Sequence, residues 1–425
     1  MRLRSKLVAV VVAVATATAV ASCSSTGTSP RSSESPTGSL QIFSWWTASA
    51  EAAALKALMD NYVNEYPGVH IVNAAVAGGG GGNAKAVLQS RLQGGDAPDS
   101  WQTSPGSIMK QYVDAGVVQP VTDIYDNKLR SAIPAPLLKS MSVGNDIYGS
   151  ATGVHRGNVL FYNKALLAKS GIEVTTDTTM TQFVASLQRL GSAGVTPFCL
   201  GDATIFGDQV ILDSLILSSV GAHDWPGLFT GNTKWTDPRI GDALGVYGQL
   251  LRVANSDHSA LTSSDAATNL AKGKCAFYIA GDWAYGYLLK AGAKDGTDFG
   301  YVPVPGTSGD FIAIVDSFVV AKAGKNQANA MKWVKSITTV KSQQDFNLQK
   351  GAIPVRTDVP MDAFPPYQRQ SAADFKSGEL IWGLASGEVG SPSFVQAYGQ
   401  AITVFNGNHD VNQFQKAMST AAASS

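Results

Sequence analysis

Segments with strand patterns and segments with helix patterns alternate along this chain, and this alternation constrains the fold more than any other feature. Leu55, Leu58, Met59 and Tyr62 recur at helical spacing and predict an amphipathic helix over 50–66. Helix patterns also separate most of the predicted strands, which lie at 69–76, 100–103, 158–162, 195–200, 274–280, 301–305 and 311–321. Such alternation predicts an α/β fold in which a parallel sheet carries helices on both faces.

The N-terminus has the pattern of an export signal. Three basic residues within the first six precede an apolar run over 7–21, which is too short and too rich in Ala and Thr for a good membrane-spanning helix. The run ends Val-Ala-Ser-Cys, which resembles the lipobox of bacterial lipoproteins. The resemblance implies a lipoprotein signal peptide over 1–22, palmitate-type acyl chains on Cys23, and a lipid anchor at the extracytoplasmic face of the cell membrane. An ordinary secretory signal followed by a chance cysteine is the alternative.

The composition favours two domains and a neutral ligand. Residues 23–38 are rich in Ser, Thr, Pro and Gly and predict a flexible tether, after which roughly 385 residues remain, enough for two domains. Basic and acidic residues number 32 each, so no basic excess argues for a nucleic acid partner. Charged residues are only 15% of the chain, whereas eight Trp and 13 Tyr are present. For an exported protein, this balance favours a hydroxyl-rich, uncharged ligand.

Two cysteines remain besides Cys23. Cys199 and Cys275 each lie in a short apolar run that predicts a strand. In an oxidising compartment two such thiols often pair, so we expect a disulfide if the two strands are neighbours. The alternative is two small buried thiols.

The sequence carries no motif for metal, nucleotide or hydrolase chemistry. The five glycines at 78–82 lack the Lys-Ser/Thr dipeptide of a phosphate loop and favour a tight turn between a strand and a helix. The five histidines are scattered, without the spacing of zinc ligands, and no G-x-S-x-G motif is present. We therefore expect no cofactor and no metal.

Aromatic and short polar residues gather at the predicted strand ends and helix starts. In open α/β sheets a ligand binds beyond the carboxyl ends of the strands. Indole rings offer flat apolar platforms for the C–H faces of a pyranose, and polar side chains supply fixed partners for its hydroxyls. A single Trp is more often a core residue, but together the residues favour a cleft suited to a sugar, lined by Trp45, Trp46, Glu51, Gln102, His155, Asn158, Trp225, Asp282, Trp283, Asp316 and Lys350.

Five stretches carry a resemblance to a known family. They are, in chain order, WWTASAEAAALKALMDNY, VAGGGGGNAKAVLQSRLQGGDAPD, GVHRGNVLFYNKALLAKSGI, AGDWAYGY and LQKGAIPVRTDVP, spread over 45–360. The sequence resembles the extracytoplasmic solute-binding lipoprotein of a carbohydrate ABC transporter (family 1 type) and is most similar to the glucose/mannose-binding proteins of that group. The order and spacing of the stretches make the resemblance specific.

The resemblance implies a two-lobed periplasmic-binding-protein fold, in which each lobe is a sheet flanked by helices and the hinge is crossed more than once. Lobe one would comprise 39–153 plus 312–357, and lobe two 154–311 plus 358–425. The ligand would lie between the lobes, and hinge closure around it would be expected.

The resemblance also implies roles for the candidate residues. Trp45 and Trp46 would form a stacking platform, Trp225 would close the opposite face, and the remaining candidates would bind hydroxyls, with Asp282 in its Gly-Asp-Trp motif as the foremost acceptor. Ser104 would contribute beside Gln102. The family often carries a longer basic residue where this chain has Ser104, which leaves room for a sugar other than glucose or for an oligosaccharide.

The function implied is capture without catalysis. The protein would bind a glucose-like monosaccharide or a short oligosaccharide as a monomer. It would deliver the sugar to separate permease subunits that work with a cytoplasmic ATPase. Two alternatives stay open: a lipid-anchored glycosidase that uses Glu51 and Asp282 as its carboxylate pair, and a binding protein of the same fold for a non-sugar polyol.

Overall fold

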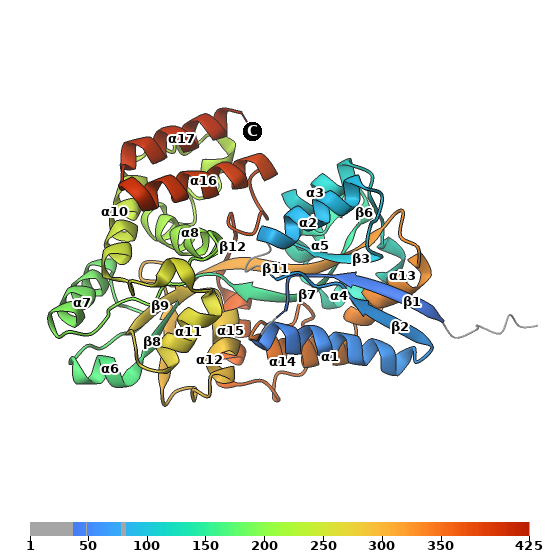
Figure 1. The fold of residues 1–425 in the computed structure, drawn as a ribbon, viewed down its shortest axis with the longest axis horizontal. Coiled ribbons are helices and arrows are strands. Elements are labelled where there is room, and N and C mark those ends of the chain that lie inside the picture. Colours follow the sequence, from blue (N-terminus) through green and yellow to red (C-terminus); the bar gives the residue numbers. More distant parts are fainter. Residues whose placement is uncertain (1–36, 48, 78–81, 425) are drawn as a thin grey trace, which may run out of the picture. The chain divides into compact units, whose positions relative to one another are not determined.

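The structure is a computed structural model that describes residues 37–47, 49–77 and 82–424 (Figure 1). The predicted signal peptide at 1–22, the lipidation site Cys23, nearly all of the predicted tether and the glycines at 78–81 lie outside the described residues. Among the described residues, no helix combines the length and the apolarity that crossing a bilayer requires.

The first sheet has seven strands and a mixed direction. Its main path runs β12-β11-β3-β1-β2, and both β4 and β7 pair with β11. Strand β1 is parallel to β2 and β3, whereas β11 is antiparallel to β3, β4 and β7. The strands are β1 Gly38–Phe43, β2 Val69–Asn73, β3 Ser100–Thr103, β4 Val118–Gln119, β7 Gly149–Arg156, β11 Asp310–Ala321 and β12 Glu379–Trp382.

The second sheet has three antiparallel strands in the order β10-β8-β9. These strands are β8 Val159–Asn163, β9 Phe277–Ala280 and β10 Phe299–Pro303. The prediction of parallel strands is therefore correct for β1 to β3 and wrong for the second sheet and for β11. The physical reason is the path of the chain. Strand β8 carries the chain away from the first sheet and β10 carries it back, so the two strands run in opposite directions. A short hairpin of β5 Ser142–Val143 and β6 Asp146–Ile147 stands apart.

Helices cover both faces of the first sheet (Figure 1). Strand β1 shows why: Leu40 and Ile42 pack with the core on the α1 side, whereas Phe43 packs with Ala84 and Leu88 of α2 on the other side, as strand alternation requires. The predicted helix over 50–66 is confirmed as α1. The helices of this lobe are α1 Ser49–Glu65, α2 Gly82–Gln93, α3 Ser107–Asp114, α4 Asn127–Ala132, α5 Ala135–Ser140, α13 Gln327–Ile337 and α14 Val340–Lys350.

The second sheet has its own helices and its own apolar core. Helix α15 Pro366–Ser377 joins the two cores, since Tyr367 packs in the second core and Phe375 against the first. The other helices are α6 Lys164–Lys169, α7 Met180–Ser192, α8 Phe206–Val220, α9 Gly227–Thr230, α10 Pro238–Val253, α11 Ser263–Ala271, α12 Trp283–Lys290, α16 Pro392–Asn408 and α17 Val411–Ala423. Two sheets, each flanked by helices, confirm the predicted fold class; we call them lobe one and lobe two.

The exact lobe boundaries remain a prediction. The chain passes between the sheets from β7 to β8 and again from β10 to β11, in keeping with a multiply crossed hinge. Strand β12, which the predicted boundaries give to lobe two, pairs with β11 of the first sheet. We propose the boundaries 39–153 plus 312–357 and 154–311 plus 358–425 with that strand as the shared element.

A disulfide joins Cys199 and Cys275 within lobe two. Their Cα atoms lie 5.4 Å apart, and both residues are buried. The segment predicted as a strand at 195–200 forms only isolated bridges, in which Phe198 pairs with Phe277 and with Ala254. Those bridges place the two cysteines side by side.

Candidate functional site

A small cavity lies where the two lobes meet, beyond the ends of β1 and β3. Its volume is about 60 Å³. Trp45 follows β1 by two residues and Ser104 follows β3 directly, so the cavity occupies the position expected for a ligand crevice in an open α/β sheet. Seven of the predicted site residues line it: Trp45, Glu51, Ser104, His155, Trp283, Asp316 and Lys350.

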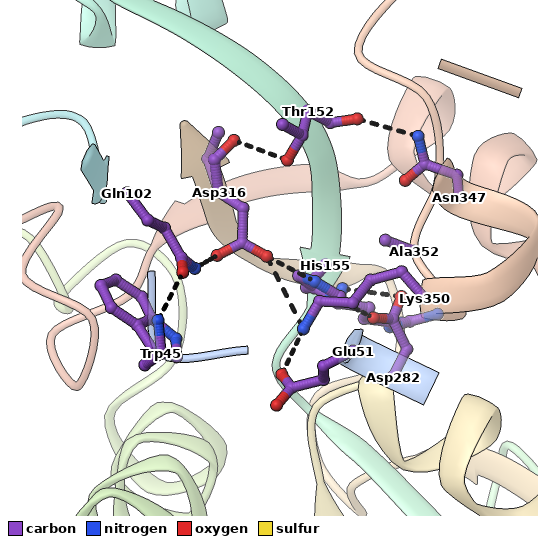
Figure 2. A network of polar contacts seen from close by, with 12 residues as sticks. Trp45, Glu51, Gln102, Thr152, His155, Asp282, Asp316, Asn347, Lys350 and Ala352 are labelled. Carbon is purple, nitrogen blue, oxygen red and sulfur yellow. Dashed lines mark hydrogen bonds and ion pairs between the residues drawn. The ribbon is translucent and has the colours of Figure 1, made fainter. Parts of the chain in front are cut away.

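His155 on β7 forms the centre of a charged network (Figure 2). Its Nδ1 contacts a carboxylate oxygen of Asp282, and its Nε2 lies 3.1 Å from Oδ2 of Asp316. Burial alone would lower the pKa of His155, but the two carboxylates outweigh burial and raise this pKa. The placement of one acid at each ring nitrogen therefore favours the protonated imidazole.

A bulge in the pairing of β7 with β11 sets the position of Asp316. The register shifts between Asp316, which pairs with Gly153, and Ser317, which pairs with Ala151, so Thr152 is the extra residue. Thr152 donates a hydrogen bond from Oγ1 to the backbone oxygen of Asp316 at 3.2 Å (Figure 2). The bulge thus fixes the backbone from which the Asp316 carboxylate reaches the cavity.

Lys350 joins the two acids that line the cavity. Its Nζ lies 2.5 Å from Oε1 of Glu51 on α1 and 3.8 Å from Oδ2 of Asp316. Burial would raise the pKa of Asp316, but Lys350, His155 and Gln102 together lower this pKa below its ordinary value. Both acids therefore present oxygen atoms in fixed positions to the cavity.

The end of α14 fixes Lys350. Lys350 is its last residue, and Gly351 follows with φ of 89°, a left-handed conformation that ends the helix. A Cβ at position 351 would lie 2.7 Å from the backbone oxygen of Asp282. Only glycine therefore allows α14 to approach the Asp282 backbone this closely and to carry Lys350 into the network.

The two neighbouring tryptophans point in different directions. Trp45 lines the cavity, whereas the Trp46 ring lies in the core of lobe one, with ring centroids 5.2 Å from Phe346 and 5.8 Å from Phe318. Trp46 is only 1% exposed, and the Lys350 Nζ lies 5.0 Å from its ring centroid. Trp46 thus supports the floor of the cavity and does not form part of its wall.

Two further candidates support the site from behind. Gln102 is 1% exposed; it donates to Oδ1 of Asp316 at 3.0 Å and accepts from the backbone N–H of Trp45 at 3.3 Å. Asp282 is fully buried, accepts from the backbone N–H of Arg156 and lies behind His155. The role predicted for Asp282, direct acceptance of a ligand hydroxyl, does not fit this placement.

Asn158 and Trp225 also lie outside the cavity wall. Asn158 is fully buried and donates to Thr307 and to the backbone oxygen of Asp310, which ties the start of β8 to the start of β11. Trp225 is 2% exposed, and its indole N–H donates to the backbone oxygen of Trp382 at 3.1 Å. Both side chains are engaged in structural contacts where a direct role in binding was predicted.

The sequence reasoning missed several lining residues. Tyr287 follows Trp283 by one helical turn on α12, and this spacing was a usable signal. The others lie on elements that meet only in the folded chain, so their positions carry no local pattern. The missed residues are Lys85, Phe206, Ser263, Tyr287, Ile314 and Ser386.

The geometry does not favour the glycosidase alternative. A glycosidase needs two carboxyl groups that face one scissile bond across the site. Glu51 lines the cavity, but Asp282 is fully buried against His155 and does not reach the same space. These two acids therefore do not form such a pair.

Comparison with known proteins places this architecture in a family. Residues 45–344 match the model of the bacterial extracellular solute-binding proteins. An ABC transporter extracellular-binding protein of Pyrococcus horikoshii is 32% identical over 390 residues, which cover 91% of this chain and 88% of that one. A probable sugar-binding periplasmic protein of Brucella melitensis is 28% identical and covers 90% of this chain and 91% of that one.

Solved structures share the fold at lower identity. The bacterial solute receptor AcbH, described as having an exclusive preference for β-D-galactopyranose, superposes with a TM-score of 0.79 at 17% identity and covers 92% of this chain and 98% of that one. RafE in complex with raffinose superposes with a TM-score of 0.72 at 17% identity, with coverage of 90% and 99%. The resemblance predicted from the sequence is confirmed: this chain belongs to the family of bacterial extracellular solute-binding proteins.

Proposed function

We propose that the protein captures an uncharged sugar, a glucose-like monosaccharide or a short oligosaccharide, in the cavity between its lobes. The observation that carries this proposal is the pairing of indole walls with fixed acids in one cavity. Trp45 and Trp283 offer apolar rings, and Glu51 and Asp316 offer acidic oxygen atoms beside them. A pyranose has the complementary pattern, apolar C–H faces and a rim of hydroxyl donors.

The charge pairing supports an uncharged ligand. Each acid of the network already has a cationic partner: Glu51 has Lys350, and Asp316 has Lys350 and His155. An added ligand charge would have to compete with these existing pairs. Hydroxyl groups can instead join the paired carboxylates, whose oxygen atoms have further lone pairs.

The size of the cavity implies movement during binding. Ligand sites usually measure about 300–1,000 Å³, whereas this cavity measures about 60 Å³. A pyranose therefore fits only when the lobes lie further apart than in this structure, and it stabilises the arrangement of the lobes that encloses it by its greater affinity for that arrangement. The chain crossings between the sheets provide the hinge.

The relatives support a sugar and a transport role. The Brucella relative is named for sugar binding, and a relative of Haloferax volcanii, 24% identical over 359 residues, is named as a xylose/arabinose-binding protein. We infer delivery of the intact sugar, without chemical conversion, by a monomer to separate permease subunits driven by a cytoplasmic ATPase. We further propose that lipid on Cys23 holds the protein at the outer face of the cell membrane.

Calorimetric titration with a panel of monosaccharides, oligosaccharides and polyols tests the proposal. We expect saturable binding of at least one sugar and its recovery unchanged after long incubation. Binding of polyols alone, or of no compound in the panel, would contradict it, and release of hydrolysis products would contradict the absence of catalysis.

A matched pair of variants on α1 locates the binding site. Glu51→Gln removes one charged acceptor from the cavity, and we expect sugar affinity to fall roughly ten- to hundredfold, the usual range for a hydrogen bond to a charged group. Glu65→Gln makes the same change at the exposed end of the helix and should leave affinity unchanged. Equal effects of the two substitutions would argue against this cavity as the site.

A further inference from the structure

One of the charged side chains that line the cavity has no ionic partner within the part of the chain that the structure describes. Glu51, Asp316, Lys350 and His155 all belong to ion pairs within 4 Å. Lys85 also lines the cavity, from the first turn of α2, but among the described residues its Nζ has neither an ion pair nor a hydrogen bond. Its ammonium group therefore has three donors available to a ligand.

The surroundings of Lys85 place it near the proposed sugar position and, among the described residues, leave its charge without an ion-pair partner. Its Nζ lies 5.9 Å from the ring centroid of Trp45, the indole proposed to stack on the sugar. Glu388 is the acid that acts on Lys85 electrostatically, but the two form no ion pair, and burial raises the pKa of Glu388 to about 8, which weakens the negative charge available to Lys85. Glu388 is also engaged elsewhere, by Ser386 and by the backbone N–H of Val315.

Burial also disfavours the charged form of Lys85. It lowers the pKa of Lys85, and Glu388 opposes that shift. A partly buried ammonium group without a protein acceptor has lost part of its hydration, and an oxygen atom of a ligand offsets that loss when it accepts from Nζ. The ammonium group offers no acceptor and would repel a second cation.

We propose that Lys85 is a specificity-determining residue of the sugar site, which donates to an oxygen atom of the sugar stacked on Trp45 and discriminates against amino sugars. This inference rests on the proposed function and deepens it. The acids Glu51 and Asp316 accept hydrogen bonds from hydroxyl groups on one side of the ligand, and Lys85 supplies a donor on another. A neutral sugar satisfies both, whereas an ammonium group beside Lys85 would face like-charge repulsion.

The test compares Lys85→Met with the wild-type protein by calorimetry. The ligands are the neutral sugar that binds best in the panel and its 2-amino-2-deoxy analogue. Methionine keeps an unbranched side chain of similar length but removes the charge and the donors. We expect the wild-type protein to bind the neutral sugar at least tenfold more tightly than the analogue. In the variant, affinity for the neutral sugar should fall about tenfold or more. The ratio of the affinities for the neutral sugar and the amino analogue should decrease at least threefold.

Two further variants keep the test decisive. Lys56→Met makes the same change at an exposed position of α1 and should alter neither affinity nor preference. Lys85→Arg keeps the charge and should keep the preference, which a purely structural role would not require; it also serves if the methionine variant fails to fold. If a folded Lys85→Met protein binds both ligands as the wild-type protein does, the inference about Lys85 is overturned and the proposed function stands. If the wild-type protein binds no sugar, the proposed function and this inference are both overturned.

Discussion

Replacing Glu388 with glutamine should flatten the dependence of stability on pH. Glu388 is 7% exposed, and its Oε1 accepts from the backbone N–H of Val315 at 3.0 Å. Burial raises its pKa from 4.5 to about 8, although the hydrogen bonds of Ser386 and Val315 oppose the shift. Glutamine is similar in size, keeps an acceptor for Val315 and cannot ionise. The substitution therefore removes the titration of Glu388 and changes little else at this position.

The sign of the effect follows from proton binding. Between pH 4.5 and about 8 the folded protein keeps a proton on Glu388 that the unfolded chain has lost. The folded state therefore binds more protons in this window, and the free energy of unfolding falls as pH rises through it. The contribution of Glu388 is complete below pH 4.5 and is lost once pH passes about 8.

The pKa change sets an upper limit on the magnitude. One pH unit corresponds to about 1.4 kcal/mol per proton, so the span from 4.5 to about 8 gives at most roughly 5 kcal/mol. Between pH 5 and pH 8 we expect the wild-type protein to lose about 2–4 kcal/mol more than Glu388→Gln. The contributions of Asp208 and Asp213, whose pKa values burial raises to about 7, are common to both proteins and cancel in this difference.

Urea unfolding at pH 5, 6, 7 and 8 measures this difference. Glu65→Gln, at an exposed site, is the matched control and should follow the wild-type curve. Parallel curves for the wild-type protein and Glu388→Gln would refute the reasoning, because Glu388 would then ionise alike in the folded and unfolded states. The same outcome would remove the argument that Lys85 lacks a charged partner at neutral pH.

Two other predictions follow from the packing. Trp46→Ala should lower the free energy of unfolding by about 3–5 kcal/mol, as large-to-small core substitutions do, whereas Trp45→Ala should change stability far less and weaken sugar binding instead. Thermal unfolding and calorimetry of the pair check this, and a reversed pattern would contradict the assigned orientations. Removing the disulfide with the double substitution Cys199→Ala and Cys275→Ala opens a loop of 76 residues in sequence separation and should cost roughly 4 kcal/mol in the chain-entropy model. Unchanged urea unfolding of that variant would contradict the prediction.

The sequence predicted much of the fold because local patterns determine local elements. The apolar spacing of α1 and the alternation of elements along the first sheet are visible in the chain, and the resemblance supplied the lobes. The direction of β11 relative to β3 was predicted wrongly, since it depends on the path by which the chain returns from lobe two. A strand pattern does not show which way its neighbour runs.

The site was predicted less completely, because contact between the lobes decides it. Trp45 and Trp46 were expected to form one stacking platform, but in the fold Trp45 lines the cavity and Trp46 lies in the core. Asp282 was expected to touch the ligand. Its carboxylate instead contacts Nδ1 of His155, and His155 rather than Asp282 lines the cavity. Lys85 was missed because the feature that marks it is the lack of an ion-pair partner among the described residues. That lack can be recognised only in the folded chain, where the other charged residues of the cavity form ion pairs.

A crystal structure of the protein with the best-binding sugar of the panel tests the central claim most directly. We predict one sugar ring between the lobes, with its face against the indole of Trp45 and its hydroxyl groups within hydrogen-bond distance of Glu51 and Asp316. A sugar bound on the outer surface, or between the lobes without contact to Trp45 and to either acid, would contradict it.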